Sequence, residues 1–522
     1  MLTESIVLPN KYFDSVFLMR VAKRLVGESG IIQAAVVMAT PKNLQVLADA
    51  GYAGVDTLGA SVNDLIVSLQ AESLEGARAV LDSMDHWLQR DAGPVGATMV
   101  RTLEQAVNTQ RGSNLAVVSV PGEFAAGEAR RALESGLNVF LFSDNVSIED
   151  ELSLKEMARV KGLIVMGPDC GTSIIGGAGI GFANVVRRGP IGVIGASGTG
   201  IQEVTTLVHR WGSGISHAIG IGGRDLSDAI GGISALQAIN ALEADPATSV
   251  IVLLSKPPGK RTRSLIDGRI AECAKPVVTC YLGIPQGQTA GNGSATYTRN
   301  LDAAATAAVK LAGGDTGEDG AETAETVSTD SASVDSVSIE RALLMPGQRY
   351  IRGVFAGGTL CYQAQQIIRD AGLTVRSNEP LEKGMELEDS RRSTGHALVD
   401  MGADEFTRGY PHPMVDSSQR AERIMAEAND RQVAVLLLDI ILGYSASADP
   451  AGELAPAIRQ AKRLAEQRGG HLTVVASICG SPGDPQGLEI QTQRLTDAGA
   501  IVFFTGFKAA QFATAVVSGL DR

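Results

Sequence analysis

The chain has 522 residues, of which 44% are hydrophobic and 20% are charged, and its formal net charge is -13 at pH 7. A chain of this length exceeds what one hydrophobic core can hold, so several domains are expected. The acidic balance argues against nucleic acid as the main partner, because a phosphate backbone requires a basic face.

The five cysteines have no CxxC spacing, so they indicate neither a disulfide framework nor a zinc site, and no metal is expected. The N-terminus lacks the basic and then apolar pattern of a secretory signal. The longest apolar run, VAVLLLDIILGY, is interrupted by Asp439 and is shorter than the roughly 18 to 20 residues that a membrane span needs. We expect a soluble, cytoplasmic protein without membrane contact.

Residues 1–92 are expected to form a small α/β domain, because strand-like and helix-like runs alternate from SIVLP to SLEGARAVLDSMDHWLQR. Residues 110–185 continue the alternation with the short strands LAVVSVPG, NVFLFSD and LIVMGPDCG. Residues 186–313 contain the strands of GVIGASGTG, HAIGIGG, SVIVLLSKPPG and KPVVTCYLG. Strict alternation of strand and helix predicts parallel, doubly wound sheets.

Residues 314–340 differ abruptly in composition: they are acidic, rich in small residues and almost free of large apolar side chains. This composition predicts a solvated, flexible linker that is open to proteases. Residues 341–522 return to the α/β alternation with RGVFAGGTL, HALVDMG, QVAVLLLDIILGY and HLTVVASICG. Each half beside the linker has a strand-to-helix turn that bears glycine and threonine, GASGTG in the first half and AGGTL in the second.

The turn GASGTG lies between an apolar strand-like run and a helix-like run that begins at Ile201 or Gln202. Such a turn directs several backbone N–H groups into one concavity at a helix N-terminus, where hydrogen bonds and the helix dipole favour an anion. The alternative is a plain strand-to-helix turn. Serine and threonine interleaved with the glycines favour phosphate binding.

The segments MGPDCGTSIIGG, GVIGASGTGIQE, GIGGRDLSDAIGGISAL and LLSKPPG, in this order and spacing, resemble the FdrA family over nearly the whole chain. That family is similar to the α subunit of succinyl-CoA synthetase over roughly residues 110–313, and to the C-terminal domain of its β subunit over residues 341–522. The resemblance implies a CoA-binding-like Rossmann domain in residues 110–185 and flavodoxin-like domains in residues 186–313 and 341–522.

The chain departs from the synthetases at the phosphate carrier. There, a histidine in a GHAG-like motif is phosphorylated, and a glutamate at the end of a strand steadies it. Here the matching segment IPQGQTAGNGSATYTRN has no histidine, and Lys256 of LLSKPPG stands where the glutamate would lie. No stretch supplies an ATP-grasp nucleotide domain. The phosphohistidine relay is not expected to operate, and His396 in TGHALVD is interpreted as an ordinary strand-edge histidine.

The FdrA family is also linked with carbamoyl transfer to oxamate in purine and allantoin breakdown. The resemblance therefore implies a carbamoyltransferase that handles carbamoyl phosphate and a small 2-oxo acid amide such as oxamate, with partner subunits or as a homo-oligomer. Two alternatives stay open: an acyl-CoA synthetase, and a non-catalytic scaffold that binds an acyl phosphate or CoA. A CoA-like pocket is the cofactor site that the resemblance suggests.

The candidate site residues fall into three groups. Lys256 supplies a point charge, while His412 and Arg408 lie in the polar cluster TRGYPHPMVD, where His412 could protonate or orient the acyl group. The phosphate-binding candidates are Ser197, Gly198, Thr199, Gly200, Gly357, Gly358, Thr359, Gly443 and Ser445. The substrate-binding candidates are Asn145, Asp169, Arg224 and Asp225.

Plain structural alternatives stand beside these candidates. Lys256 could be a surface lysine, Arg224 and Asp225 a surface pair, and the segment around Asp416 the start of a helix. Cys170 is interpreted as a buried small hydrophobe. If the synthetase resemblance holds, Lys256 and His412 meet across one site built from the two halves.

Overall fold

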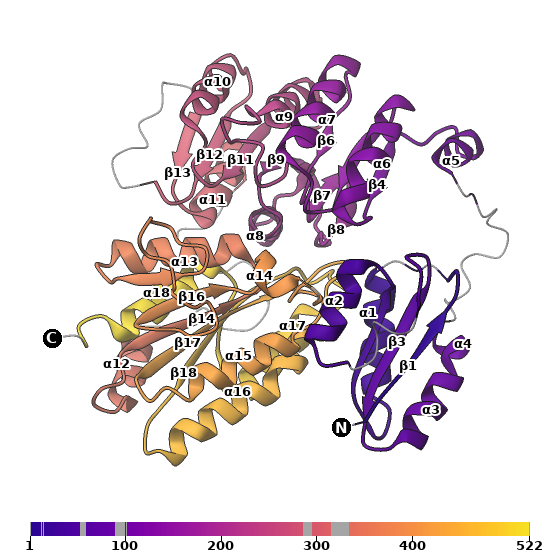
Figure 1. Ribbon diagram of the computed structural model, residues 1–522. Helices are drawn as coiled ribbons and strands as arrows, with labels where there is room; N and C mark the ends of the chain where they lie inside the picture. The colour runs from indigo at the N-terminus through magenta and orange to yellow at the C-terminus, as the bar shows by residue number, and fades with distance from the viewer. Residues whose placement is uncertain are drawn as a thin grey trace. The chain divides into compact units, whose positions relative to one another are not determined.

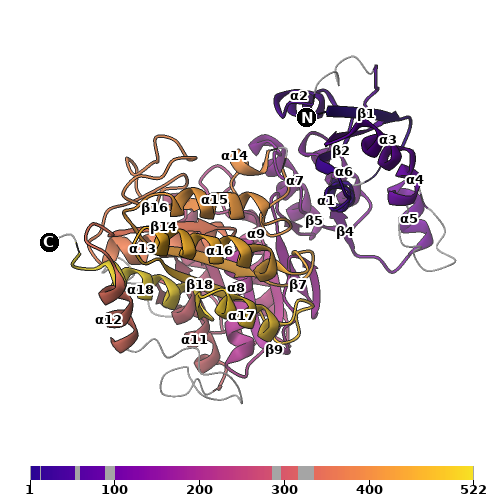
Figure 2. The same ribbon diagram turned by 90° about the horizontal axis from the view of Figure 1, so that it is seen from below.

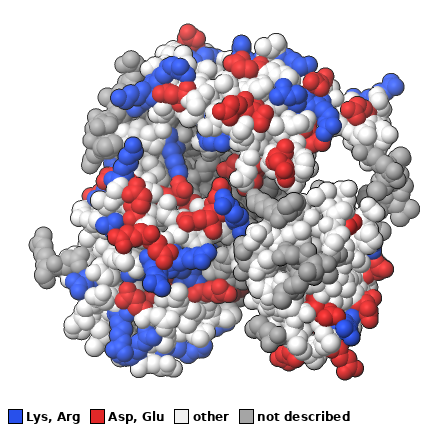
Figure 3. All heavy atoms as spheres, in the orientation of Figure 1, with Lys and Arg blue, Asp and Glu red and all other residues white. Residues whose placement is uncertain are grey.

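The computed structural model describes residues 2–11, 13, 15–52, 59–88, 100, 102–284, 295–314, 334–408 and 410–520. The chain divides into two compact units, Met1–Gln105 with Arg408–Pro411, and Ala106–Thr407 with His412–Arg522 (Figure 1). Within the described ranges, no helix combines the length and the apolarity that a membrane span requires. On the face drawn in Figure 3, basic side chains are interspersed with acidic ones.

The first unit is a three-stranded antiparallel sheet in the order β1-β3-β2, which confirms a small α/β domain at the N-terminus. The central strand is buried on both faces: Leu65, Val67 and Leu69 pack in one core cluster, and Ile66 in another. The elements are β1 (Leu2–Leu8), α1 (Ser15–Val26), β2 (Ile31–Met38), α2 (Pro41–Asp49), β3 (Leu65–Ala71), α3 (Leu74–Asp82) and α4 (Met84–Trp87). Helix α5 (Leu103–Thr109) includes the boundary between the two units.

The second unit begins with a three-stranded parallel sheet in the order β4-β5-β6, flanked by two helices. Its elements are β4 (Leu115–Val118), α6 (Gly122–Glu134), β5 (Asn138–Leu141), α7 (Ile148–Lys161) and β6 (Val165–Met166). The sequence assigned residues 110–185 to this domain. In the structure, the hairpin β7 (Thr172–Ile175) and β8 (Ala178–Gly181) instead forms the antiparallel edge of the next sheet, because β7 pairs with β10 (Ile215–Gly220).

That next sheet has seven strands in the order β13-β12-β11-β9-β10-β7-β8, and the first five strands of this order are parallel. Its further elements are β9 (Arg188–Gly195), α8 (Gly198–Arg210), α9 (Ile233–Ala244), β11 (Val250–Ser255), α10 (Lys260–Ala271), β12 (Val277–Tyr281), β13 (Ala295–Thr298) and α11 (Leu301–Leu311). This half confirms the doubly wound α/β prediction.

The last sheet has six parallel strands in the order β15-β16-β14-β17-β18-β19. Most of the predicted acidic linker lies outside the described residues, but a helix already begins at Val334, inside the predicted linker. The elements are α12 (Val334–Leu343), β14 (Tyr350–Phe355), α13 (Gly358–Asp370), β15 (Val375–Ser377), β16 (His396–Asp400), α14 (Asp404–Thr407), α15 (Ser418–Ala428), β17 (Val433–Ile441), α16 (Pro450–Gln467), β18 (Thr473–Cys479), α17 (Leu488–Asp497), β19 (Ile501–Phe503) and α18 (Gly506–Val517).

One hydrophobic core joins the seven-stranded and six-stranded halves of the second unit. It contains apolar side chains of α8 and α11 from one half and of α13 and α18 from the other, as well as residues of both sheets. A second cluster lies on the opposite face of the six-stranded sheet, where α15 and α16 lie side by side (Figure 2). The two halves therefore pack through a layer of helices.

Glu203 lies within this shared layer, on α8, and is 1% exposed. Its Oε1 accepts a hydrogen bond from the N–H of Gly506, the first residue of α18, at 2.7 Å. Burial, and then the nearby Asp302 carboxylate, raise the pKa of Glu203 from 4.5 to about 8. A neutral carboxylic acid thus connects a helix of one half to a helix of the other.

Glu203→Gln should change the pH dependence of stability. Between the unfolded pKa near 4.5 and the folded pKa near 8, the folded protein keeps a proton that the unfolded chain has lost. The free energy of unfolding of the parent should therefore fall as pH rises through this window, by on the order of a few kcal/mol. Chemical denaturation at about pH 5 and about pH 8 should show the variant gaining stability relative to the parent as pH rises. A pH-independent difference would contradict the buried, protonated carboxyl.

Candidate functional site

The GASGTG turn builds the N-terminus of α8. Ser197 is the N-cap, with φ of -147°, and its Oγ accepts a hydrogen bond from Gly200 N at 3.3 Å. The helix begins at Gly198, earlier than the predicted start at Ile201 or Gln202, because Gly198, Thr199 and Gly200 themselves form its first turn. The turn is a helix N-terminus, as the sequence predicted, and Ala196 to Thr199 are partly exposed.

The AGGTL turn builds the N-terminus of α13, which begins at Gly358 without a side-chain cap. Instead, Asp439 of β17 accepts hydrogen bonds from Ala356 N and Gly357 N, both at 2.7 Å. Arg420 of α15 donates to Asp439 Oδ1 at 2.9 Å. Burial raises the pKa of Asp439 while Arg420 opposes that rise. The pair orders the turn and leaves the first-turn N–H groups of α13, which have no intrahelical partner, for other acceptors.

The two helix N-termini meet in the second unit. Ser197 Oγ is in hydrogen-bond contact with Thr359 Oγ1. A Cβ added to Gly357 would lie 3.0 Å from Thr199 Cγ2, and one added to Gly200 would lie 3.3 Å from Thr359 Cγ2. We call Ser197–Gly200 and Gly357–Thr359 the helix junction; α8 and α13 are drawn next to each other in Figure 1. The structure thus brings together seven of the nine predicted phosphate-binding residues.

A buried carboxylate that the sequence analysis missed lies beside the junction. Asp400 ends β16, and its Oδ1 accepts a hydrogen bond from Gly402 N at 2.9 Å. A Cβ added to Gly358 would lie 2.5 Å from Asp400 Oδ2. Burial, and then Asp439 and Glu379, raise the pKa of Asp400 to about 7, while Lys256 lowers it. The signal was present in HALVD, since ligands of open parallel sheets meet the carboxyl ends of the strands.

Lys256 follows β11 in the seven-stranded half and reaches side chains of the other half. Its Nζ lies 3.8 Å from Glu379 Oε2 and 5.0 Å from the ring centre of Tyr362 on α13. The side chain is 52% exposed. It is therefore an accessible cation near Asp400, held loosely rather than buried in an ion pair.

His412 approaches Asp400 from another side. A Cβ added to Gly402 would lie 2.8 Å from His412 Nε2 and 3.2 Å from Asp400 Oδ1. His412 Nδ1 accepts a hydrogen bond from Met414 N at 3.2 Å, so the neutral ring carries its proton on Nε2. Burial, and then Arg420, lower the pKa of His412 to about 4. Lys256 and His412 thus both lie near Asp400. Arg408, in contrast, is exposed and belongs to the first unit.

Three of the four predicted substrate-binding residues gather at the carboxyl ends of β5 and β6. Asp169 N donates to Ser143 O at 3.0 Å, and Arg224 donates to Val146 O at 2.8 Å, next to Asn145. Burial, and then Asp144 and Asp404, raise the pKa of Asp169 to about 6, and Arg224 lowers it. This edge combines a partly exposed guanidinium with a carboxyl that can be protonated near neutral pH.

Asp225 does not join them, contrary to the prediction of a ligand-facing loop. It is fully buried, and its carboxylate is paired with Lys155 at 2.7 Å. The same carboxylate accepts hydrogen bonds from Ser234 N at 3.1 Å and Ala235 N at 3.0 Å. The physical reason is local: Asp225 neutralises a buried lysine and caps the start of α9.

Gly443 and Ser445, which the sequence predicted to bind phosphate, lie outside the helix junction. Gly443 N donates to Gln486 Oε1 at 3.1 Å, and a Cβ added to Gly443 would lie 2.8 Å from Ala183 O. The helix that follows, α16, is already capped by the Asp449 carboxylate, which accepts from Gly452 N at 3.0 Å. A carboxylate at that N-terminus takes the place that an anionic ligand would occupy.

The remaining predicted positions have structural surroundings. His396 Nδ1 accepts from Ile351 N at 3.1 Å, and its ring meets the edge of Tyr350, as fits a strand histidine. Burial raises the pKa of the Cys170 thiol to about 12, so it behaves as a small hydrophobe. Within the described ranges, no three His, Cys, Asp or Glu side chains lie close enough to hold a metal ion.

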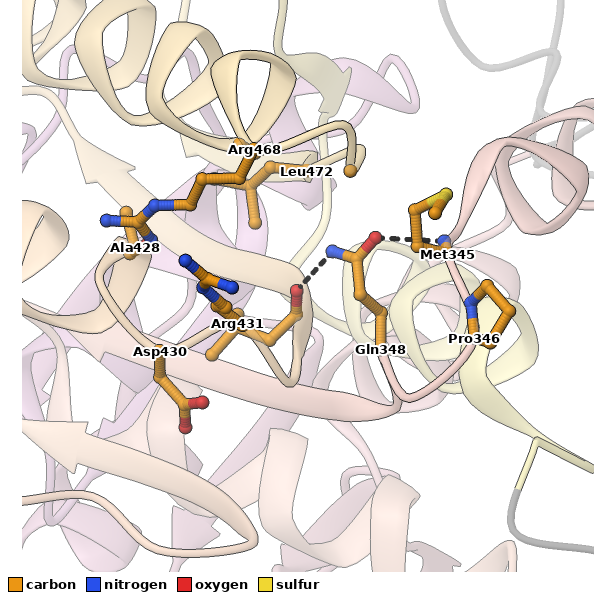
Figure 4. A pocket seen from close by; sticks show the side chains of 11 residues that line it. Met345, Pro346, Gln348, Ala428, Asp430, Arg431, Arg468 and Leu472 are labelled. Carbon is orange, nitrogen blue, oxygen red and sulfur yellow. Dashed lines mark hydrogen bonds between the residues drawn. The ribbon is translucent and has the colours of Figure 1, made fainter.

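A pocket of about 200 Å³ lies at the opposite edge of the six-stranded sheet (Figure 4). Its walls come from the amino ends of β17 and β18 and from the C-terminal ends of α15 and α16. Gln348 closes one side by donating to Val433 O at 2.8 Å. Labelled lining residues include Met345, Pro346, Ala428, Arg431, Arg468 and Leu472. This pocket is separate from the helix junction, which lies at the carboxyl ends of the strands.

Comparisons with known families divide the chain into three matched parts. Residues 1–100 match the AllF heavy metal-associated domain, residues 186–280 the CoA binding domain, and residues 354–516 the CoA-ligase family. The CoA-binding match therefore falls on the seven-stranded half with α8, rather than on residues 110–185. Residues 1–100 contain no cysteine, and the described part of this unit offers no metal-binding cluster, so it does not fit a metal site.

Relatives match the chain at different lengths. The uncharacterized protein YahF of Escherichia coli strain K12 is 41% identical over 514 residues, which cover 97% of this chain and 98% of that protein. The α subunit of a succinate–CoA ligase from Aquifex aeolicus is 28% identical over 208 residues, 38% of this chain and 67% of that protein. A solved ATP citrate lyase from Methanothrix soehngenii, in complex with citrate and coenzyme A, covers 80% of this chain and 84% of its own with 14% identity and a TM-score of 0.35.

These matches overturn the prediction of a carbamoyltransferase. Relatives with a stated activity include α subunits of succinate–CoA and malate–CoA ligases, and residues 354–516 match the CoA-ligase family. The prediction rested on a link reported for the family as a whole and on the missing carrier histidine. Neither feature distinguishes carbamoyl phosphate from other acyl phosphates, since the phosphate end of each is the same.

His412 should remain neutral throughout the physiological pH range. Its pKa of about 4 lies below the usual 6.5, so its ring proton signals in an NMR pH titration should stay at neutral positions down to about pH 5. Comparison with His412→Gln would assign the signals. A titration midpoint near 6.5 would mean that the ring is exposed to water and is not enclosed beside Asp400.

Proposed function

The chain belongs to the FdrA family of succinyl-CoA synthetase-like proteins, and on this premise we propose that it binds coenzyme A and exchanges an acyl group between the CoA thiol and phosphate. In the direction of thioester formation, the thiol sulfur attacks the acyl carbon of an acyl phosphate. The bond from the acyl carbon to the phosphate oxygen breaks, phosphate leaves, and the thiol proton passes to a base. The reaction needs no nucleotide, because the acyl phosphate enters already activated.

The observation that carries this proposal is the meeting of two glycine-rich helix N-termini at the Ser197–Thr359 contact. An anion held there is stabilised by the N–H groups of two helices and by both helix dipoles. Lys256 adds an accessible positive charge near Asp400, on the side of α13. A leaving phosphate is the anion that such a site suits.

Asp400 is the proposed proton acceptor. A base works best when its pKa lies near the working pH, and burial brings the pKa of Asp400 to about 7. Taking the thiol proton neutralises Asp400, so the carboxyl no longer repels the phosphate that leaves in the same step. His412, neutral and with Nε2–H directed toward the Gly402 and Asp400 region, is the proposed donor to the acyl oxygen.

The carboxyl edge of the three-stranded sheet is the proposed contact for CoA. Arg224 is partly exposed there and can bind a phosphate of the nucleotide end. Its bonds to Val146 O and Glu151 fix its direction before a ligand arrives.

A non-catalytic scaffold is the second candidate. The direct contact of the Ser197 and Thr359 hydroxyls, and the bonds from Ala356 N and Gly357 N to Asp439, fix the junction within the protein and favour a role without turnover. Both candidates predict binding of CoA and phosphate. They differ in whether the acyl group moves.

Exchange can be measured with labelled inorganic phosphate and an acyl-CoA panel, separating the labelled acyl phosphate from inorganic phosphate by chromatography. The parent should incorporate label, and Gly198→Val should lose most of this activity because its side chain would crowd Thr172 Oγ1, which lies 3.1 Å from a Cβ at this position. Gly268→Val is the matched control, since a Cβ at Gly268 on α10 meets open space. CoA binding without exchange would assign the scaffold, and failure to bind CoA would refute both candidates.

A further inference from the structure

Thr172, the first residue of β7, has a buried hydroxyl that the site described so far does not use. The residue is 1% exposed, and its Oγ1 has no hydrogen-bond partner among the described residues. Burying a hydroxyl without a partner costs free energy, so its retention requires an explanation. Valine has the same shape and would avoid that cost.

The hydroxyl faces the N-terminus of α8. A Cβ added to Gly198 would lie 3.1 Å from Thr172 Oγ1, which is the nearest atom to it. Gly198 directly follows Ser197, whose hydroxyl contacts Thr359 of α13. The unpartnered oxygen therefore adjoins the helix junction, on the side formed by the β7–β8 hairpin.

We propose that Thr172 is a third hydroxyl ligand, beside Ser197 and Thr359, for a phosphoryl group bound at the helix junction. The inference rests on the proposed function, which makes the helix junction a phosphate site. It adds Thr172 to that site and a tetrahedral shape for the ligand. Hydroxyls from three separate elements, β7 and the starts of α8 and α13, together with helix N–H groups, suit a tetrahedral group that presents several acceptor oxygens. A carboxylate holds its acceptor sites in one plane, so it matches donors from three separate elements less well.

Neutral donors suit this place in the fold. Asp400 and Asp439 both lie beside the α13 end of the junction, and Arg420 is already committed to Asp439. Hydroxyl groups bind an anion without adding buried charge, and they can turn to donate when the ligand arrives. The Ser197 and Thr359 hydroxyls contact each other, whereas Thr172 Oγ1 has no hydrogen-bond partner among the described residues.

The test compares Thr172→Val with Thr172→Ser and with Thr279→Val. Thr279 is a fitting control because its Oγ1 is also buried without a partner, but it lies on β12 rather than at the junction. Binding of inorganic phosphate to the full chain, measured by calorimetry, should weaken roughly tenfold to a hundredfold in Thr172→Val, as expected for loss of a hydrogen bond to a charged ligand. Thr172→Ser should retain most of the affinity, and Thr279→Val should match the parent.

A stability measurement separates this role from a structural one. Without phosphate, Thr172→Val should unfold at the same temperature as the parent or higher, because an unsatisfied buried hydroxyl is removed. A loss of phosphate affinity that Thr279→Val shares would overturn the proposal. These readouts do not require acyl exchange, so they fail or succeed separately from the proposed reaction.

The source of the phosphoryl group is distinguished by a second probe, 3′-phosphoadenosine 5′-diphosphate, the nucleotide end of CoA. Weaker binding of inorganic phosphate alone supports a site for free phosphate or an acyl phosphate. Weaker binding of the nucleotide alone supports Thr172 as a phosphoryl ligand that serves CoA. If neither probe binds more weakly to Thr172→Val, Thr172 is not a ligand.

Discussion

The ion pair between Arg420 and Asp439 holds the start of α13 in place, and the rest of the junction depends on that start. Asp439 interrupts an otherwise apolar strand and is completely buried, yet each oxygen accepts a backbone N–H of the turn before α13. Arg420 compensates the charge and also donates to Val354 O at 2.9 Å. Removing one partner would leave a buried charge uncompensated, which is far more costly than the pair is stabilising. One pair thus fixes α15, β14, β17 and α13 relative to each other.

Polar contacts then align this half with the seven-stranded half. Asn184 donates to Leu442 O at 2.9 Å and to Asp484 at 2.7 Å, and Gln202 of α8 donates to Leu442 O at 3.1 Å. These bonds have specific directions, unlike the apolar layer of α8, α11, α13 and α18 beside them. The apolar layer supplies most of the attraction, whereas the amide side chains set the register in which Ser197 meets Thr359.

The sequence was sufficient for the alternation of strands and helices and for the GASGTG and AGGTL turns, because alternation and glycine placement are local signals. It was insufficient for side chains whose role depends on what another element brings. Asp225 was predicted to face a ligand from a loop, but its partner is Lys155, which lies seventy positions away in the sequence. Gly443 and Ser445 looked like a phosphate loop, since nothing local shows that Asp449 already caps the helix. Asp400 and Asp439 were overlooked because an acidic residue in an apolar strand is usually taken as a break in the pattern. The sequence does not show that such a residue can bind the backbone of another element.

The shared core has a consequence for assembly. The family resemblance relates these two halves to two different subunits of the synthetase, whereas here they are segments of one polypeptide and pack through one hydrophobic layer. Their encounter is therefore unimolecular, with an effective concentration set by the tether rather than by the amounts of two proteins. Dilution therefore cannot separate the N-termini of α8 and α13. Because both helices belong to one polypeptide, each molecule contains one of each.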